Sequence, residues 1–272
     1  MCCIFGLGLF TGHDFKSAST MTGVISRLFK EAESGGRKAS GLSIMREKSV
    51  HILRRPMSAT ELVSSDEYMD FMHAHLKPAD ESNKLMSVIG HCRWPTQGKP
   101  EDNLNNHPQV IDNIIGVHNG VITNDHTLFE SFEKVIDRKA EVDTEIIFQL
   151  ISHFNKNPSS KTVDAIDHAT RYLAGSYACG MQNTKHPYNL YLFKRGNPIT
   201  VKRYPKVGVV MFGTRAHFMK DAYEDFVDDT GRGKEIAIGD KQGLVFNLWT
   251  HTLCRFNFKD NLDIKELHAN AG

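Results

Sequence analysis

The sequence predicts an α+β protein in which antiparallel sheets pack between layers of helices. Short apolar segments follow one another in hairpin-like succession over much of the chain. Segments with helical spacing of apolar residues fall into two separate groups. A doubly wound parallel sheet would need a regular alternation of strand and helix, which this order does not have.

The first part of the chain predicts a strand, a helix and a hairpin. Residues 2–10 are apolar and spaced by glycines, which indicates a buried strand. Apolar residues recur at helical spacing over residues 15–33, and a Gly-Gly pair ends that helix. The apolar runs 42–45 and 50–53 flank a charged turn, as in a hairpin. A second helix is expected over residues 66–76, before a polar loop.

The same two patterns recur to the end of the chain. Strands are expected over residues 85–93, 114–122, 175–181, 190–193, 199–201, 207–212, 235–238, 244–248 and 253–258. Helices are expected over residues 128–136, 144–151, 161–173 and 216–226. No linker or repeat divides these segments. We therefore expect one domain over residues 1–258 and a polar C-terminal tail over residues 259–272.

Composition and charge narrow the class of protein. The chain has 272 residues, of which 40% are hydrophobic and 24% charged, as in ordinary globular proteins. Because the net charge is only +1, we expect no nucleic-acid partner. Because no long apolar run is present, we expect no membrane partner. The start does not resemble a secretory signal, and five scattered cysteines favour reduced thiols in the cytoplasm. His73 and His75 form an isolated pair, which we interpret as surface histidines and not as metal ligands. We expect no cofactor.

Cys2 could become the N-terminal residue of the mature protein, because it directly follows the initiator methionine. Removal of Met1 would leave a residue that carries both a thiol and a free α-amino group. The amine has an ordinary pKa of about 7.7–8.0 and can act as a base for the thiol. The alternative interpretation is that Cys2 and Cys3 are apolar residues that open a core strand.

Three further segments carry candidate functional side chains. Arg93 ends an apolar strand and begins a loop bounded by proline and glycine, a position that suits a bidentate grip on a carboxylate. Asn119 and Gly120 form either a tight turn or an exposed amide beside a glycine N–H, the donors of an oxyanion hole. Asp143 precedes an apolar helix and could be only its N-cap.

Together these segments resemble a class II glutamine amidotransferase domain of the N-terminal-nucleophile hydrolase superfamily. The motifs are Met-Cys with an apolar strand, Gly-His-Cys-Arg-Trp-Pro-Thr-Gln-Gly, Asn-His-Pro, Val-His-Asn-Gly-Val-Ile, Asp-Thr-Glu and Gly-Ser-Tyr-Ala. They are most similar to the glutaminase half of glucosamine-fructose-6-phosphate aminotransferase, from residue 2 to about residue 248. The resemblance implies a four-layer αββα sandwich and L-glutamine as the substrate.

The resemblance also implies roles for individual residues. Cys2 would attack the side-chain amide of glutamine, with its own α-amino group moving the proton. Asn119 and the N–H of Gly120 would stabilise the oxyanion. Arg93 would pair with the α-carboxylate of glutamine, and Asp143 would hold its α-ammonium group.

A loop that contains Trp94 and Thr96 would cover the bound substrate. Four positions depart from the family pattern, namely Cys3, Pro95, Gln97 and Val142. Pro95 and Gln97 replace an alanine and a histidine, which would change how the loop moves. Cys3 replaces a glycine and would add bulk beside the nucleophile. None of these changes removes a group with a catalytic role.

Three functions remain open at this point. The first is a stand-alone glutaminase subunit that supplies ammonia to a separate synthase, because the chain shows no phosphate-binding loop and no acceptor domain. The second is an autonomous hydrolase of γ-glutamyl amides or peptides. The third is a catalytically silent binding module, which the complete set of candidate catalytic and binding residues disfavours.

Overall fold

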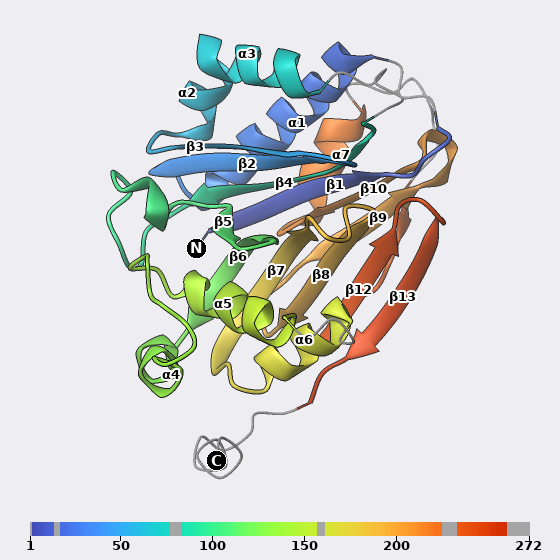
Figure 1. Ribbon diagram of the computed structural model, residues 1–272. Helices are drawn as coiled ribbons and strands as arrows, with labels where there is room; N and C mark the ends of the chain where they lie inside the picture. The colour runs from blue at the N-terminus through green and yellow to red at the C-terminus, as the bar shows by residue number, and fades with distance from the viewer. Residues whose placement is uncertain (1, 14–16, 77–82, 157–160, 225–232, 260–272) are drawn as a thin grey trace.

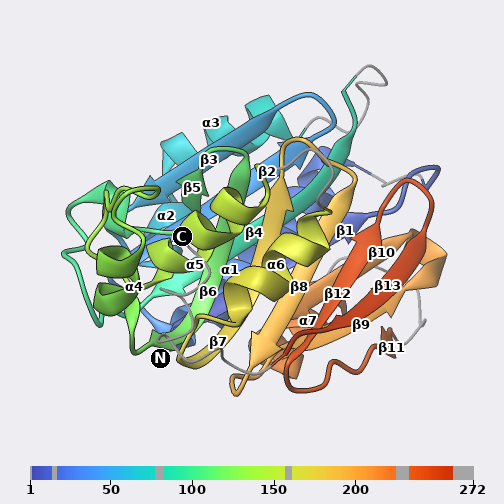
Figure 2. The same ribbon diagram turned by 60° about the horizontal axis from the view of Figure 1, so that its bottom comes forward.

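The computed structural model describes residues 2–13, 17–76, 83–156, 161–224 and 233–259. Within these residues the strands form two sheets in which all neighbouring strands are antiparallel (Figure 1). Layers of helices cover the outer faces of both sheets (Figure 2). The expected αββα sandwich is therefore confirmed.

The first sheet has the strand order β11-β9-β10-β1-β4-β2-β3. Its strands are β1 (Cys3–Leu9), β2 (Ala39–Arg46), β3 (Val50–Arg55), β4 (Leu85–Arg93), β9 (Thr200–Tyr204), β10 (Val209–Gly213) and β11 (Lys234–Glu235). Helices α1 (Ala18–Ala32), α2 (Ala59–Val63), α3 (Asp66–His75) and α7 (Ala216–Glu224) belong to this half of the molecule. Their apolar faces form one core with the outer face of the sheet.

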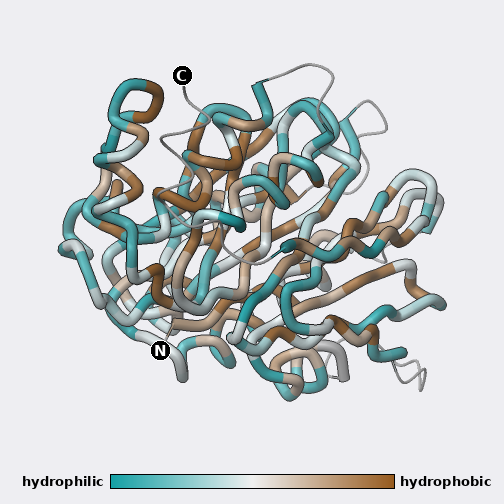
Figure 3. The backbone as a smooth tube through the Cα atoms, turned by 90° about the horizontal axis from the view of Figure 1, so that it is seen from below, coloured by the Kyte–Doolittle hydropathy of each residue, from teal (hydrophilic) through white to brown (hydrophobic). Residues whose placement is uncertain are grey.

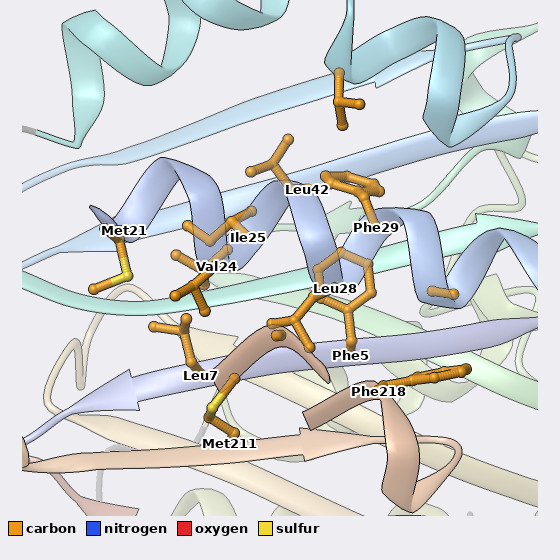
Figure 4. Packing of buried hydrophobic residues seen from close by; sticks show 14 of the residues in the cluster. Phe5, Leu7, Met21, Val24, Ile25, Leu28, Phe29, Leu42, Met211 and Phe218 are labelled. Atoms are coloured by element: carbon orange, nitrogen blue, oxygen red, sulfur yellow. The ribbon is translucent and has the colours of Figure 1, made fainter. Parts of the chain in front are cut away.

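Helix α1 forms because its apolar residues share one face. Ser17 caps it by accepting a hydrogen bond from the N–H of Thr20 at 3.1 Å. Figure 4 shows the apolar face of α1 packed against the side chains of β1. The rings of Phe29 and Phe5 meet edge to face, with centroids 4.8 Å apart. This packing anchors the strand that follows Cys2.

The second sheet has the order β13-β12-β8-β7-β6-β5. Its strands are β5 (Gln109–Ile111), β6 (Ile114–Ile122), β7 (Gly175–Asn183), β8 (Asn189–Arg195), β12 (Gln242–Asn247) and β13 (Thr252–Asn257). Helices α5 (Thr144–Phe154) and α6 (Thr162–Thr170) cover it, and α4 (Asp125–Ser131) lies beside them. A third apolar core fills the space between the two sheets. In Figure 3 the brown segments lie mainly within the body of the molecule, and many of the loops at its edge are teal.

Most predicted elements exist, but several boundaries differ. The helix expected over residues 128–136 ends at Ser131, because a separate turn follows in which the N–H of Ile136 donates to the Phe132 carbonyl at 3.0 Å. That turn buries Ile136 but leaves Val135 48% exposed. Strand β5 and helix α2 were not predicted, since three and five residues are too short for a periodic signal.

The interpretation of Asn119 and Gly120 as a tight turn is wrong. Strand β6 runs through both residues and pairs with β7 as far as Ile122. The C-terminal tail predicted over residues 259–272 lies, apart from Lys259, outside the described residues, so the division at residue 258 stays a prediction.

Candidate active site

The candidate site residues come from both sheets and meet at one end of the sandwich. Cys3 pairs with Cys92 between β1 and β4, which brings Cys2 next to Arg93. The Nε2 atom of His91 on β4 lies 3.1 Å from the carbonyl oxygen of His118 on β6. These contacts bring Arg93, at the end of β4, and Asn119 of β6 to the same end of the two facing sheets.

The thiol of Cys2 is held by the backbone of the covering loop. Its Sγ atom lies 3.3 Å from both the nitrogen and the carbonyl oxygen of Trp94. Burial raises the pKa of this thiol, while the N–H of Trp94 and the positive charge of Arg93 oppose the rise. A thiol with a raised pKa is mostly protonated at neutral pH. An attack by Cys2 therefore needs a base that takes the proton.

The side chain of Cys3 lies in the core and not beside the thiol of Cys2. It is buried in the core between the first sheet and its helices, 1% exposed. Its Sγ atom fits against Gly35, which has no side chain. A Cβ atom at residue 35 would lie only 2.3 Å from this sulfur. The bulk expected beside the nucleophile is thus accommodated by a glycine at the end of the first helical segment.

Asn119 carries a buried side-chain amide that is poised to bind a ligand. The residue is fully buried, and both its Oδ1 and its Nδ2 atoms have no hydrogen-bond partner among the described residues. Buried polar groups without partners cost free energy and are rare in folded proteins. A substrate oxygen that accepted from Nδ2 would remove part of this cost, as in an oxyanion hole.

Gly120 is required by the space around it. Its φ angle is +152°, which side-chain-bearing residues rarely adopt. A Cβ atom at this position would lie 2.0 Å from the carbonyl oxygen of Ser176 and 2.7 Å from Nε2 of His118. Any residue other than glycine would therefore displace the backbone N–H that follows Asn119.

The side chain of Asp143 does not cap helix α5. It is the residue before α5, but its side chain makes no hydrogen bond to the start of that helix. Its Oδ2 atom instead accepts from the N–H of Ile122 at the end of β6, at 2.7 Å. The carboxylate is 5% exposed and acts electrostatically on both Cys2 and Arg93. A negative charge is thus available beside the nucleophile.

Arg93 is occupied by its own loop in this structure. One guanidinium nitrogen donates to Oδ1 of Asn106 at 3.0 Å, and the other donates to the carbonyls of Gly98, at 2.8 Å, and Gln97. A guanidinium group has five N–H donors, so these bonds leave capacity for a carboxylate. The bonds to Gln97 and Gly98 also tie the guanidinium group to the loop. A ligand that binds Arg93 would therefore affect the position of the loop.

The loop itself is open to solvent. Trp94 is 53% exposed, and Thr96 is exposed as well. Residues of the loop line an open hollow of 560 Å³ that also contacts His126 and Glu141. Neither Cys2 nor Asn119 lines this hollow, so the structure places Thr96 on the exposed loop and brings Trp94 to the thiol through its backbone.

Three buried histidines behind the site had no role in the sequence analysis. Oγ1 of Thr144 lies 2.9 Å from Nε2 of His107 and 2.9 Å from Nδ1 of His118. The ring of His91 stacks on that of His107, with centroids 4.0 Å apart. Burial lowers the pKa of all three, to about 3 for His91, so they are neutral at pH 7. Because a carbonyl only accepts, Nε2 of His91 is the donor to His118.

Comparisons with known proteins bear on this arrangement. No protein-family model matches the chain. A glutamine–fructose-6-phosphate aminotransferase (isomerizing) of Listeria monocytogenes is 27% identical over 248 residues, which cover 90% of this chain and 38% of that protein. The aminotransferase of the same name from Bacillus licheniformis is 24% identical over 247 residues, again with 90% and 38% covered. The chain is thus similar, over 90% of its length, to part of two aminotransferases that are named for glutamine.

A solved structure has the same fold as this chain. The glutamine phosphoribosylpyrophosphate amidotransferase of B. subtilis, complexed with ADP and GMP, superposes with a TM-score of 0.66. The match covers 96% of this chain and 50% of that one, at 17% identity. The matched part of the chain thus spans 38% of the length of these curated relatives and half of this structural neighbour.

Neither a cluster of metal-binding side chains nor a membrane-spanning helix occurs among the residues that the structure describes. No group of three or more histidine, cysteine or acidic residues there is arranged to hold a metal ion. None of the helices described is long and apolar enough to cross a membrane.

Proposed function

We propose that this domain hydrolyses the side-chain amide of L-glutamine through a thioester on Cys2. The observation that carries the proposal is the buried amide of Asn119, which has no partner among the described residues. It lies on β6 beside Gly120, whose backbone conformation side-chain-bearing residues rarely adopt. The similarity to aminotransferases that are named for glutamine supports the same substrate.

The proposed reaction begins after removal of Met1. The α-amino group of Cys2 takes the thiol proton, and the sulfur attacks the amide carbon of glutamine. Asn119 and the N–H of Gly120 donate to the oxyanion, where one such donor is typically worth about 2.7–4 kcal/mol. The carbon–nitrogen bond then breaks, and the α-ammonium group returns the proton to the departing ammonia. Water attacks the thioester, which releases glutamate and the thiol.

Recognition of the amino acid is assigned to the two charged side chains. Arg93 would pair with the α-carboxylate and Asp143 with the α-ammonium group, because a zwitterion needs one cation and one anion. The loop with Trp94 and Thr96 would close over the substrate. The bonds from Arg93 to the carbonyls of this loop support a closure that responds to the substrate carboxylate.

We further propose that the ammonia passes to a separate cytoplasmic synthase, which docks near Trp94. A glutaminase that releases ammonia into water wastes glutamine, so we expect slow turnover until a partner closes the loop. Steady-state ammonia release should be weak for the isolated chain and should rise when the partner and its acceptor are present. Full-speed hydrolysis that no partner changes would contradict this part of the proposal.

The test of the chemistry compares two adjacent cysteines. Cys2→Ala should abolish release of glutamate and ammonia from glutamine, while Cys3→Ala should keep substantial activity because Cys3 lies in the apolar core. Mass spectrometry should show that Met1 is removed. A dead Cys3→Ala variant with an active Cys2→Ala variant would refute the assignment. A strong preference for γ-glutamyl peptides over glutamine would instead favour an autonomous γ-glutamyl hydrolase.

A further inference from the structure

A tight turn after β8 places an asparagine against the proposed oxyanion hole. The Nδ2 atom of Asn197 donates to the backbone carbonyl of Asn119 at 2.8 Å, across 78 residues of sequence. The same Nδ2 atom lies close to Gly120 as well, since a Cβ atom added at Gly120 would be only 2.8 Å from it. Asn197 thus contacts the peptide group that joins Asn119 to Gly120.

The turn that carries Asn197 is held on both sides. Gly196 has a φ angle of +74°, and its N–H donates to Oδ1 of Asp240 at 2.6 Å. Gly196 also forms a parallel bridge with Tyr177 on β7. Pro198 follows and restricts the backbone of Asn197. The side chain of Asn197 therefore extends from a fixed backbone position.

The geometry of the peptide bond links this contact to catalysis. The carbonyl of Asn119 and the N–H of Gly120 belong to one planar group and point in opposite directions. A hydrogen bond that fixes the direction of the carbonyl therefore fixes the direction of the N–H. This restraint matters at Gly120, because glycine by itself gives the backbone more freedom than any other residue.

We propose that Asn197 is a positioning residue that aims the N–H of Gly120 into the oxyanion hole. This inference rests on the proposed function of Asn119 and Gly120. Asn197 touches no reacting atom, so it should not alter how glutamine binds. Its loss should lower the rate of thioester formation, because a donor that is free to rotate stabilises the oxyanion less.

The kinetic test uses Asn197→Ala and a matched control. Asn189, at the opposite end of β8, is also half-buried and donates its side-chain amide to Tyr191 at 3.1 Å. For Asn197→Ala we expect kcat for glutamine to fall at least about tenfold with little change in KM. Asn189→Ala should keep the kcat of the unaltered protein. Equal kcat values in the two variants would overturn the inference.

Alkylation by iodoacetamide separates positioning from general damage. This reaction needs the thiol of Cys2 but forms no oxyanion, so its rate should be unchanged in Asn197→Ala. A parallel loss of alkylation and of kcat would indicate a disturbed nucleophile and would refute the positioning role.

The position of the N–H is also measured without any substrate. In ¹⁵N NMR spectra, Asn197→Ala should shift the amide resonance of Gly120 and speed its hydrogen exchange, while Asn189→Ala should do neither. If the unaltered protein does not hydrolyse glutamine, the proposed function fails, and this measurement still decides whether Asn197 orients the peptide. An unchanged Gly120 resonance would overturn the inference in either case.

Discussion

His91 should make the folded protein sensitive to acid. Burial, together with the charge of Arg93, lowers its pKa from 6.5 to about 3. The unfolded chain therefore binds a proton near pH 6.5 that the folded chain does not bind until about pH 3. The free energy of unfolding falls as the pH falls through this window, by about 1.4 kcal/mol per pH unit for this one group.

Replacement of His91 by glutamine isolates its contribution. Glutamine can still donate to the carbonyl of His118, but it binds no proton in this range. Between pH 6.0 and 4.5, the unaltered protein should lose about 2 kcal/mol more unfolding free energy than His91→Gln. Guanidinium denaturation at a series of pH values measures this difference. The quantity to compare is the slope of the unfolding free energy against pH. The absolute free energies also differ, because the substitution changes the packing at every pH.

A second histidine variant controls for the loss of a titrating group. His73 is exposed on α3, far in sequence from the site. Of the two histidine variants, only His91→Gln should make the free energy of unfolding depend less steeply on pH, because only His91 is buried. Identical slopes in the unaltered protein and in His91→Gln would refute the reasoning, since His91 would then bind protons equally in both states.

Two further predictions concern the site. Arg93→Ala and Asp143→Asn should each lower kcat/KM for glutamine by about 30-fold or more, because loss of one partner of a desolvated charge pair costs about 2 kcal/mol or more; normal kinetics in either variant with unchanged circular dichroism would reject these roles. Gly120→Ala should reduce kcat by at least about 100-fold, because its Cβ atom would collide with the carbonyl of Ser176; full activity in this variant would show that the Gly120 N–H is not needed.

The sequence by itself determined most of the strands, the helix α1 and the candidates for chemistry. Apolar periodicity is a local property, because a strand or helix buries one face whatever lies on the other side. Cys2, Arg93 and Asn119 lie in short motifs that each left a purely structural alternative open, and their expected roles came from the resemblance of these motifs, in their order along the chain, to a known family. Elements too short to show a period, such as α2 and β5, were missed.

Only the tertiary structure decided how those residues are used. It showed that Asp143 bonds to the end of β6 instead of to its own helix, and that Arg93 grips its loop. It also brought Asn197 to the carbonyl of Asn119, and His91 to that of His118. These contacts join residues 4–78 positions apart, and most cross between elements. A local pattern specifies which face a side chain takes, but its partner depends on strand order and register, which the packing of the whole chain determines.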